Sequence, residues 1–210
     1  MTLYSGFKAF FKGTFRLLYR HQIYGSEHFP EGGAIIAPNH ASFWDPPLVG
    51  ASAPDEVSFL ARSTLYGPFL GPFLRRLNTF PAKGAESLDS IKMICNLLKE
   101  GKKVVIFPEG HRTEDGLLGP FKSGVAMLAF RAQCPIIPAY IEGTYSIWDR
   151  WHRLPRLFGR TACVFGSPIQ CEPYLKMPKK EGQEAMALAV RHAIEALEVW
   201  YKAGAQGMPP

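Results

Sequence analysis

The sequence predicts an α/β domain, with a mostly parallel central sheet flanked by helices and an amphipathic helix at its N-terminus. Three observations predict this fold class. Short apolar runs bounded by Gly and Pro are typical of buried strands. Longer segments between them carry apolar residues three and four positions apart, which is the spacing of helices. The two kinds of segment alternate along the chain, as they do in parallel sheets covered by helices.

Residues 3–20 are predicted to form the amphipathic helix. On a helical wheel the hydrophobic residues share one side, and cations recur every fourth position on the other. Aromatic residues opposite cations are typical of a helix in the headgroup region of a membrane, so we expect residues 1–24 to be a membrane-association segment. The alternative is a helix packed on the domain with solvated cations. The apolar side comprises Leu3, Phe7, Phe10, Phe11, Thr14, Leu17 and Leu18, flanked by Tyr4 and Phe15; the cations are Lys8, Lys12, Arg16 and Arg20.

The remaining pattern predicts one domain over residues 25–203, followed by a loose tail at residues 204–210. We expect strands at residues 34–37, 57–61, 103–107, 135–141 and 161–165, and helices at residues 87–99, 123–132 and 181–202. Ligands of parallel sheets bind beyond the carboxyl ends of the strands. Motifs that directly follow a strand are therefore the first candidates for a site.

The composition favours a globular protein with an anionic partner. Hydrophobic residues make up 47% and charged residues 20% of the 210 residues, and the formal net charge is +6. This excess suits an anionic membrane surface, an acidic carrier protein or a phosphorylated substrate. The basic residues form neither a long run nor a nucleic-acid motif, so we predict no nucleic-acid partner. No signal peptide is visible, and no apolar run approaches the roughly 18 residues of a membrane-spanning helix.

Several common catalytic and metal-binding patterns are missing from the sequence. The four cysteines form no CxxC pair, so we expect no metal site and no disulfide framework, and reduced thiols in the cytoplasm. There is no serine in a GxSxG elbow, no Walker loop and no GxGxxG fingerprint. A histidine base acting on a substrate hydroxyl needs none of these.

A histidine and an aspartate five residues apart follow the first predicted strand. His40 can accept a proton near neutral pH, and a carboxylate on its other ring nitrogen would fix the tautomer and stabilise the imidazolium. Asp45 can supply that carboxylate only if the segment departs from a helix, because helical residues five apart lie about 140° apart around the axis. Pro46 favours a turn at Asp45. The alternative is a loop histidine, with Asp45 capping a helix that starts near Pro46.

A second motif, Phe-Pro-Glu-Gly-His-Arg-Thr at residues 107–113, follows the third predicted strand. It places a carboxylate and a planar guanidinium three residues apart in a turn, and arginine suits bidentate recognition of phosphate. Lys122 lies beside the first turn of a predicted helix, which is a favourable position for an anion. We therefore expect Glu109, Gly110, Arg112 and Lys122 to bind the substrate. The alternative is a surface turn with an exposed ion pair.

In this order, the motifs resemble those of the glycerolipid acyltransferase family, the PlsC type. Residues 40–45 resemble the family's Hx4D box, residues 107–113 its FPEGTRS box and residues 136–141 its proline-bearing fourth block. Its second block, a strand that ends in Asp-Arg, is matched least well, because Ala82 and Lys83 stand in those positions. Lysine keeps the charge of arginine but not its planar fork. By this resemblance, which covers about residues 30–170, Lys83 and Arg62 become further candidates for substrate binding.

The resemblance implies 1-acylglycerol-3-phosphate O-acyltransferase activity. The co-substrate would be an acyl-CoA or acyl carrier protein thioester, the acceptor lysophosphatidic acid and the product phosphatidic acid. His40 would be the general base and Asp45 would orient it, with no bound cofactor and no metal. Because the acceptor partitions into bilayers, the enzyme would be a peripheral or monotopic protein on the cytoplasmic face of the cell membrane, bound to its anionic surface.

Other interpretations differ in the acyl acceptor, in whether the protein is an enzyme, or in which segments contact the membrane. A related acyltransferase would use glycerol 3-phosphate, an ornithine lipid or another lysolipid. A catalytically idle membrane-binding module would need only the N-terminal helix and a basic face, but the presence of both His40 and Asp45 favours an enzyme. A group of tryptophans and arginines is either a second interfacial patch or, as we expect, a solvated loop: Trp148, Arg150, Trp151, Arg153 and Arg156.

Overall fold

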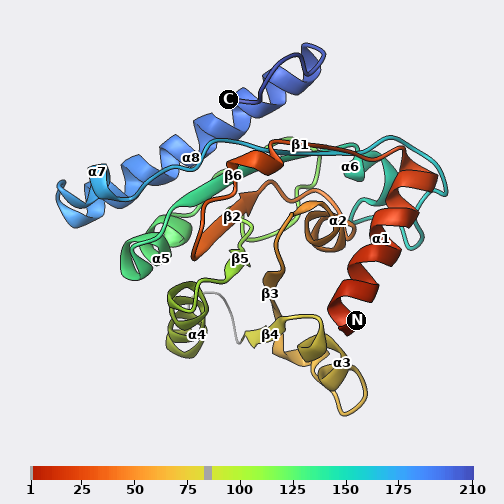
Figure 1. The fold of residues 1–210 in the computed structure, drawn as a ribbon, viewed down its shortest axis with the longest axis horizontal. Coiled ribbons are helices and arrows are strands. Elements are labelled where there is room, and N and C mark those ends of the chain that lie inside the picture. Colours follow the sequence, from red (N-terminus) through yellow and green to blue (C-terminus); the bar gives the residue numbers. More distant parts are fainter. Residues whose placement is uncertain (1, 83–86) are drawn as a thin grey trace.

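The central sheet has seven strands in the order β1-β7-β6-β2-β5-β3-β4 (Figure 1). It is seen in a computed structural model that describes residues 2–82 and 87–210. The pairs β1–β7, β2–β5, β2–β6, β3–β4 and β3–β5 are parallel, and β6–β7 is antiparallel, so the predicted mostly parallel α/β fold is confirmed. The strands are β1 (Gln22–Tyr24), β2 (Ala34–Pro38), β3 (Val57–Arg62), β4 (Thr79–Ala82), β5 (Lys103–Val105), β6 (Ile136–Glu142) and β7 (Ala162–Phe165).

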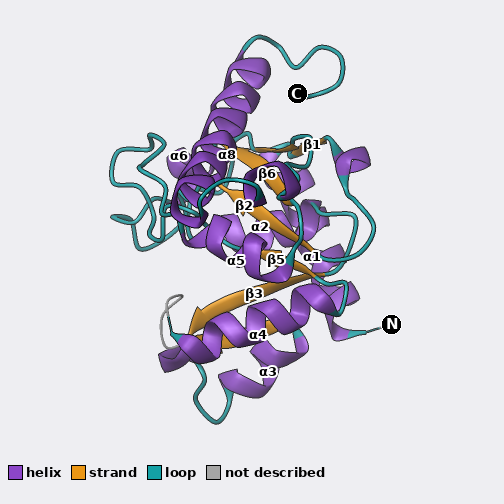
Figure 2. Cartoon of the chain, turned by 90° about the vertical axis from the view of Figure 1, so that its left-hand side faces the viewer, coloured by secondary structure: helices purple, strands orange, loops and turns teal. Residues whose placement is uncertain are grey.

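Helices cover both faces of the sheet. On β2 the side chain of Ile35 packs into the hydrophobic cluster beneath α4, α5 and α8, and that of Ile36 packs into the cluster beneath α1, α2 and α6. Figure 2 looks onto the layer that contains α4, α5 and α8. A strand buried on both faces is apolar throughout, which is why β2 is visible in the sequence. The helices are α1 (Leu3–Tyr19), α2 (Asp45–Ser52), α3 (Leu70–Arg76), α4 (Leu88–Lys99), α5 (Gly124–Ala132), α6 (Thr144–Trp148), α7 (Glu172–Leu175) and α8 (Lys179–Lys202).

Helix α1 both packs on the domain and exposes apolar side chains. Tyr4, Phe15 and Tyr19 are buried, and the ring of Phe15 lies 5.6 Å from that of Trp44, next to α2. Other members of the predicted apolar side face solvent, with Leu3 45%, Phe10 65% and Leu17 80% exposed. Docking on the domain therefore leaves much of that side without a protein partner. Within the described ranges, no helix has the length and hydropathy needed to cross a bilayer.

Two strands were not predicted from the hydrophobic pattern, and both lie at sheet edges. β1 has three residues, too few to show a periodic pattern. β4 contains Pro81, and proline within a run of residues weakens a strand prediction because it cannot donate to the ladder. The predicted strand at 103–107 is shorter in the structure, because Ile106 and Phe107 continue beyond β5 and lead into the second motif. Residues 204–210 turn back toward β7, where the backbone N–H of Ser167 donates to the carbonyl of Pro210.

Candidate active site

The histidine motif begins where β2 ends, and Asn39 holds this point in place. Its side-chain amide donates to the carbonyl of Ile141 over 3.1 Å, and its side-chain oxygen accepts from the N–H of Ile141 over 2.7 Å. The side chain of Asn39 thus continues the pairing of β2 with β6 beyond the last residue of β2. The backbone is fixed immediately before His40, although it leaves the sheet there.

Asp45 is completely buried and accepts four hydrogen bonds. Its Oδ2 atom accepts from Nδ1 of His40 at 2.8 Å, and from the backbone N–H groups of Ala41 at 2.6 Å and Ser42 at 2.7 Å. Its Oδ1 atom accepts from the hydroxyl of Thr144 at 2.7 Å. An ionised carboxylate can only accept, so Nδ1 carries the proton and Nε2 is the ring nitrogen left for a substrate.

The turn that brings His40 and Asp45 together is stabilised by the residues between them. The hydroxyl of Ser42 accepts from the N–H of Trp44 and donates to the carbonyl of Trp148. Asp45 itself is the first residue of α2, and Pro46 follows in the helix's first turn, a position that suits proline. The segment from His40 to Trp44 is not helical, as the pairing of His40 with Asp45 requires.

The imidazole of His40 is held on its face as well as at its edge. It stacks on the ring of Phe107, with centroids 3.9 Å apart and planes tilted by 23°. Its side chain is 17% exposed. The stacking and the bond to Asp45 together restrict the ring to one orientation, with one side open to a substrate.

Glu109 is placed differently from the prediction that it would hold the substrate. Its carboxylate accepts from the backbone N–H of His40 over 2.7 Å and from the N–H of Gly119 over 2.9 Å, and the residue is only 2% exposed. Burial raises the pKa of Glu109, and the two N–H donors counteract part of this rise. Since both oxygens bind backbone groups, we assign Glu109 to positioning His40.

Gly110 and Lys122 lie beside each other. Gly110 has a φ of +77°, and a Cβ on it would approach Cε of Lys122 to 3.2 Å. This backbone conformation favours glycine, and any larger residue would also have to displace the lysine side chain slightly. The backbone N–H of Lys122 donates to the carbonyl of Pro108. This bond fixes the backbone of Lys122 next to the second motif.

Arg112 lies at the site through an aromatic contact. The carbon of its guanidinium lies 3.5 Å from the centroid of the Phe43 ring, a distance typical of a cation–π interaction. Arg150 lies close by: its Nη1 atom pairs with Glu114 at 2.9 Å and donates to the carbonyl of Arg112 at 3.4 Å. Arg150 was not predicted to be a site residue, because it lies far from both motifs in the chain.

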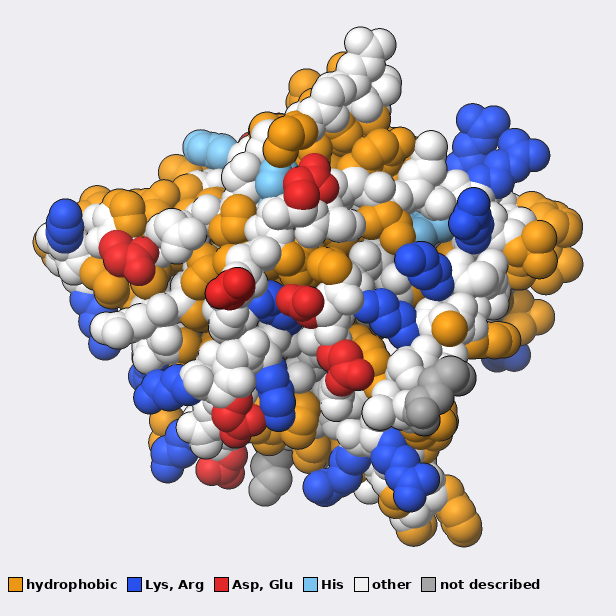
Figure 3. Space-filling model, viewed as in Figure 1, with side chains coloured by type: hydrophobic (Ala, Val, Ile, Leu, Met, Phe, Trp, Pro, Cys, Tyr) orange, Lys and Arg blue, Asp and Glu red, His pale blue; other side chains and the backbone are white. Residues whose placement is uncertain are grey.

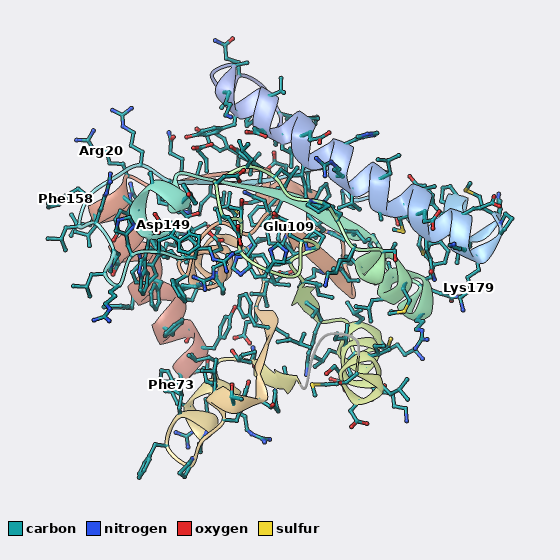
Figure 4. All side chains as sticks on the ribbon, turned by 180° about the vertical axis from the view of Figure 1, so that it is seen from behind. Arg20, Phe73, Glu109, Asp149, Phe158 and Lys179 are labelled. Carbon is teal, nitrogen blue, oxygen red and sulfur yellow. The ribbon has the colours of Figure 1, made fainter. Side chains whose placement is uncertain are left out.

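Several of the residues described above, among them His40, Gly110, Arg112 and Arg150, border a cavity of about 550 Å³. Figure 4 views the molecule from the side opposite to Figure 1 and labels Glu109 among the surrounding side chains. Lys83 lies outside the described residues. Arg62 ends β3, and its side chain also lies outside the described part of the structure. The cavity is lined by His40, Phe43, Leu60, Ala61, Leu65, Ile94, Val105, Ile106, Phe107, Gly110, His111, Arg112, Leu128 and Arg150.

An apolar cavity of about 290 Å³ adjoins the site. It shares Leu60, Ala61, Val105 and Phe107 with the first cavity, so the two lie on either side of the same residues. It extends toward α1, α2 and α3, where its lining includes Tyr4, Phe7, Phe11, Gly50 and Leu74. Its lining is mostly hydrophobic, as a site for a hydrocarbon chain would be.

Three of the four cysteines are poor candidates for a nucleophile. Cys134, Cys163 and Cys171 are buried, and burial raises the pKa of Cys134 and of Cys163 to about 12. Such thiols are protonated at neutral pH, and the thiolate is the reactive form. Within the described residues, no group of three His, Cys, Asp or Glu side chains is placed to hold a metal ion.

Comparison with known proteins identifies the family. The model of the acyltransferase family matches residues 20–142, more than half of the chain. The chain belongs to the acyltransferase family. The acyltransferase is 29% identical to the 1-acyl-sn-glycerol-3-phosphate acyltransferase of Bacillus subtilis (strain 168) over 181 residues, which are 84% of this chain and 87% of the relative. It is 30% identical to the Pseudomonas aeruginosa enzyme of the same name over 158 residues, covering 73% of this chain and 60% of that one.

The acyltransferase also resembles a solved structure over almost its whole length. The crystal structure of the 1-acyl-sn-glycerophosphate acyltransferase PlsC from Thermotoga maritima matches with a TM-score of 0.74 and 25% identity, covering 93% of this chain and 80% of that one. The family indicated by the motifs is therefore confirmed. Sequence motifs located His40, Asp45 and Arg112. Asn39 and Thr144 were missed because their partners, Ile141 on β6 and Asp45 on α2, are distant in the sequence.

Proposed function

We propose that this acyltransferase moves a fatty acyl group from a thioester, acyl-CoA or acyl carrier protein, to the free hydroxyl of lysophosphatidic acid, giving phosphatidic acid. The observation that carries the proposal is the pair of His40 and Asp45 at a cavity that also contains Arg112. The names of the relatives from Bacillus subtilis and Pseudomonas aeruginosa and of the solved structure support this acceptor.

The proposed reaction is a single acyl transfer with His40 as general base. Nε2 of His40 takes the proton of the acceptor hydroxyl as its oxygen attacks the thioester carbonyl. The C–S bond breaks, the acyl group stays on the oxygen, and the sulfur leaves as a thiol with the proton from the imidazolium. The negative charge of Asp45 stabilises the imidazolium while it exists. The side chains of the protein are unchanged at the end.

The phosphate of the acceptor would bind at the cationic side of the cavity. Arg112 supplies a planar guanidinium that its contact with Phe43 holds in place. Arg150 lines the same cavity, and Lys122 lies next to the Gly110 turn. Lys83 and Arg62 remain sequence-based candidates for the same role.

The apolar cavity beneath the site would hold an acyl chain. It adjoins the active-site cavity at Phe107, whose ring also stacks on His40. Because Phe107 lines both cavities, a chain lying there would pass close to the residue that stacks on the histidine. Substitution of Gly50 or Leu74, which line this cavity away from the histidine, should change the preferred chain length while leaving the His40–Asp45 pair intact.

We further propose a peripheral position on the cytoplasmic face of the membrane, bound in part through α1. The side chains of Leu3, Phe10 and Leu17 are exposed, and so are the cations Lys12 and Arg16. Apolar and basic groups exposed together favour an anionic lipid surface. Phe11 is unsuitable for testing this role, because it packs against Phe15 and Trp44 within the fold.

The proposal is tested with purified protein, a panel of acyl acceptors and both thioester donors. Lysophosphatidic acid should be the preferred acceptor over glycerol 3-phosphate and other lysolipids. His40→Ala should abolish transfer without changing the circular dichroism spectrum. His192→Ala, an exposed histidine on α8, serves as the matched control and should be fully active. Near-normal turnover by a folded His40→Ala protein contradicts the mechanism, and preference for another acceptor contradicts the substrate.

A further inference from the structure

The loop after α6 exposes large hydrophobic side chains. Trp148 is half-buried and packs against Trp44, with ring centroids 5.1 Å apart. The side chains that follow it face solvent instead, with exposed fractions of 66–80%. Trp148 and Trp151 were grouped together from the sequence, but in the structure Trp148 packs on the domain and Trp151 faces solvent. The exposed residues, here called the 151–158 set, are Trp151, Leu154, Leu157 and Phe158.

Arginines alternate with these hydrophobic side chains. Arg150, Arg153, Arg156 and Arg160 are all exposed. Arg150 pairs with Glu114, and within the described ranges no carboxylate forms a salt bridge with the other three. The hydrophobic groups thus lie in a surface with surplus positive charge. This combination suits a surface that is both apolar and anionic.

Hydrogen bonds to its backbone hold the loop against the domain. The hydrophobic side chains are therefore exposed on an ordered segment. The N–H of Arg156 donates to the carbonyl of Ile147, and the hydroxyl of Tyr19 donates to the carbonyl of Arg156 over 2.9 Å. The N–H of Gly159 donates to the carbonyl of Leu18 over 3.3 Å. The loop is therefore attached to the last turns of α1, where Leu17 is 80% exposed.

The loop also reaches the active-site cavity. Arg150 lines that cavity, and the indole N–H of Trp151 donates to the carbonyl of Glu114. Figure 4 shows Phe158 projecting at the same edge as Arg20, while Asp149 lies nearer to Glu109. In Figure 3, hydrophobic side chains lie beside Lys and Arg at the right-hand edge, where Figure 1 places α1 and the α6 region. One continuous loop thus connects the cavity to the exposed edge.

We propose that residues 150–158 are a second membrane anchor, separate from α1, which inserts the 151–158 set into the headgroup region of an anionic bilayer and holds the cavity entrance at its surface. Tryptophan suits this depth, since its ring is apolar and its N–H polar. The arginines would contact lipid phosphates. The proposal rests on the proposed function only for the idea that the acceptor is drawn from the bilayer.

The test compares flotation with vesicles of phosphatidylcholine containing phosphatidylglycerol. The loop variant is Leu154→Ser/Leu157→Ser/Phe158→Ser, and it should bind at least about tenfold more weakly than the parent, since these side chains supply the inserted apolar area. The matched control changes three exposed residues on the other face of the sheet, Leu88→Ser/Leu188→Ser/Val199→Ser, and should bind like the parent. The tryptophan fluorescence of the parent should shift to shorter wavelength on binding, and a Trp151→Phe variant should show a smaller shift.

A second variant keeps the proposal testable if the first one folds poorly. Arg153→Gln/Arg156→Gln leaves the hydrophobic groups in place and should weaken binding roughly fivefold per cation, but only to the anionic vesicles. Vesicle binding equal to that of the parent in both variants overturns the proposal. So does a defect limited to the KM for acyl carrier protein, because the loop would then contact the carrier.

Activity separates this proposal from the proposed function. The loop variants should keep the parent's rate on a short-chain, water-soluble lysophosphatidic acid and lose rate on the same lipid in vesicles. If the parent binds vesicles through the loop but transfers no acyl group to either form, the proposed acceptor is wrong and the anchor stands. If the parent is active on vesicle lipid and the loop variants match it there, the anchor is wrong and the acceptor stands.

Discussion

Replacing Asp45 with asparagine should slow acyl transfer by about tenfold to a hundredfold. In a serine-protease-type triad the same change costs about 10⁴, because the amide fixes the wrong histidine tautomer. Here Oδ2 of Asp45 also accepts from two backbone N–H groups, those of Ala41 and Ser42. An amide –NH₂ at that position would face three donors, so the amide oxygen must point toward His40 and the tautomer is kept.

The magnitude follows from the charge that asparagine lacks. A hydrogen bond to a charged group contributes about 1.5–3 kcal/mol and a neutral one about 0.5–1.5 kcal/mol. The bond to His40 therefore loses about 1–2 kcal/mol, or roughly five- to thirtyfold in rate, and removal of the charge near the imidazolium extends this toward a hundredfold. Weakening of the bonds to Ala41, Ser42 and Thr144 in the asparagine variant should together lower the free energy of unfolding by about 3 kcal/mol.

Asp45→Ala is unsuitable for measuring the catalytic role of Asp45. It would leave two buried N–H groups and the Thr144 hydroxyl without an acceptor, at about 1–3 kcal/mol each. That total approaches the whole stability of a typical domain, about 5–15 kcal/mol. An inactive Asp45→Ala protein would therefore say nothing about catalysis.

The assay is kcat on a soluble acceptor, together with the urea midpoint of unfolding. The control is Asp89→Asn, which changes an exposed aspartate in the first turn of α4. It should leave both kcat and the urea midpoint nearly unchanged. A loss near 10⁴ in a folded Asp45→Asn protein would show that the amide does turn its nitrogen to His40. Unchanged kcat would show that the negative charge has no part in the reaction.

Three further predictions concern the groups around this pair. Glu109→Gln converts one carboxylate oxygen into a donor that faces an N–H, so kcat should fall and the free energy of unfolding should drop by about 1–3 kcal/mol; a rise in acceptor KM alone would show that Glu109 touches the substrate after all. Arg112→Ala should raise the KM for lysophosphatidic acid roughly ten- to a hundredfold and leave the thioester KM unchanged, with Arg131→Ala as the control. Burial lowers the pKa of His21 to about 4, so the unfolded chain takes up the proton first as pH falls below 6.5. The free energy of unfolding should therefore decrease by up to about 3 kcal/mol between pH 6.5 and pH 4, and urea titrations of His21→Gln should lack this decrease.

The buried central strands and the two motifs were determined by local sequence. β2, β5 and β6 lie inside the sheet with both faces covered, so their apolar runs needed no knowledge of their neighbours. The histidine motif was visible because His40 and Asp45 lie five residues apart. The arginine motif was visible because its residues are contiguous in the sequence, although the contacts of Glu109 and Arg112 with His40 and Phe43 join distant parts of the chain. The shortest edge strand, β1, was invisible because three residues carry no period.

Tertiary structure decided which group contacts which. The bond of Thr144 to Asp45 joins residues far apart in the chain, and nothing local marks that threonine. Glu109 looked like a substrate ligand in sequence, yet the turn that carries it folds over the His40 backbone and buries its carboxylate. The apolar side of α1 could equally have faced a core or a lipid surface. Only the docking of Phe15 on α2 showed that part of it packs on the domain, while Phe10 and Leu17 remain exposed.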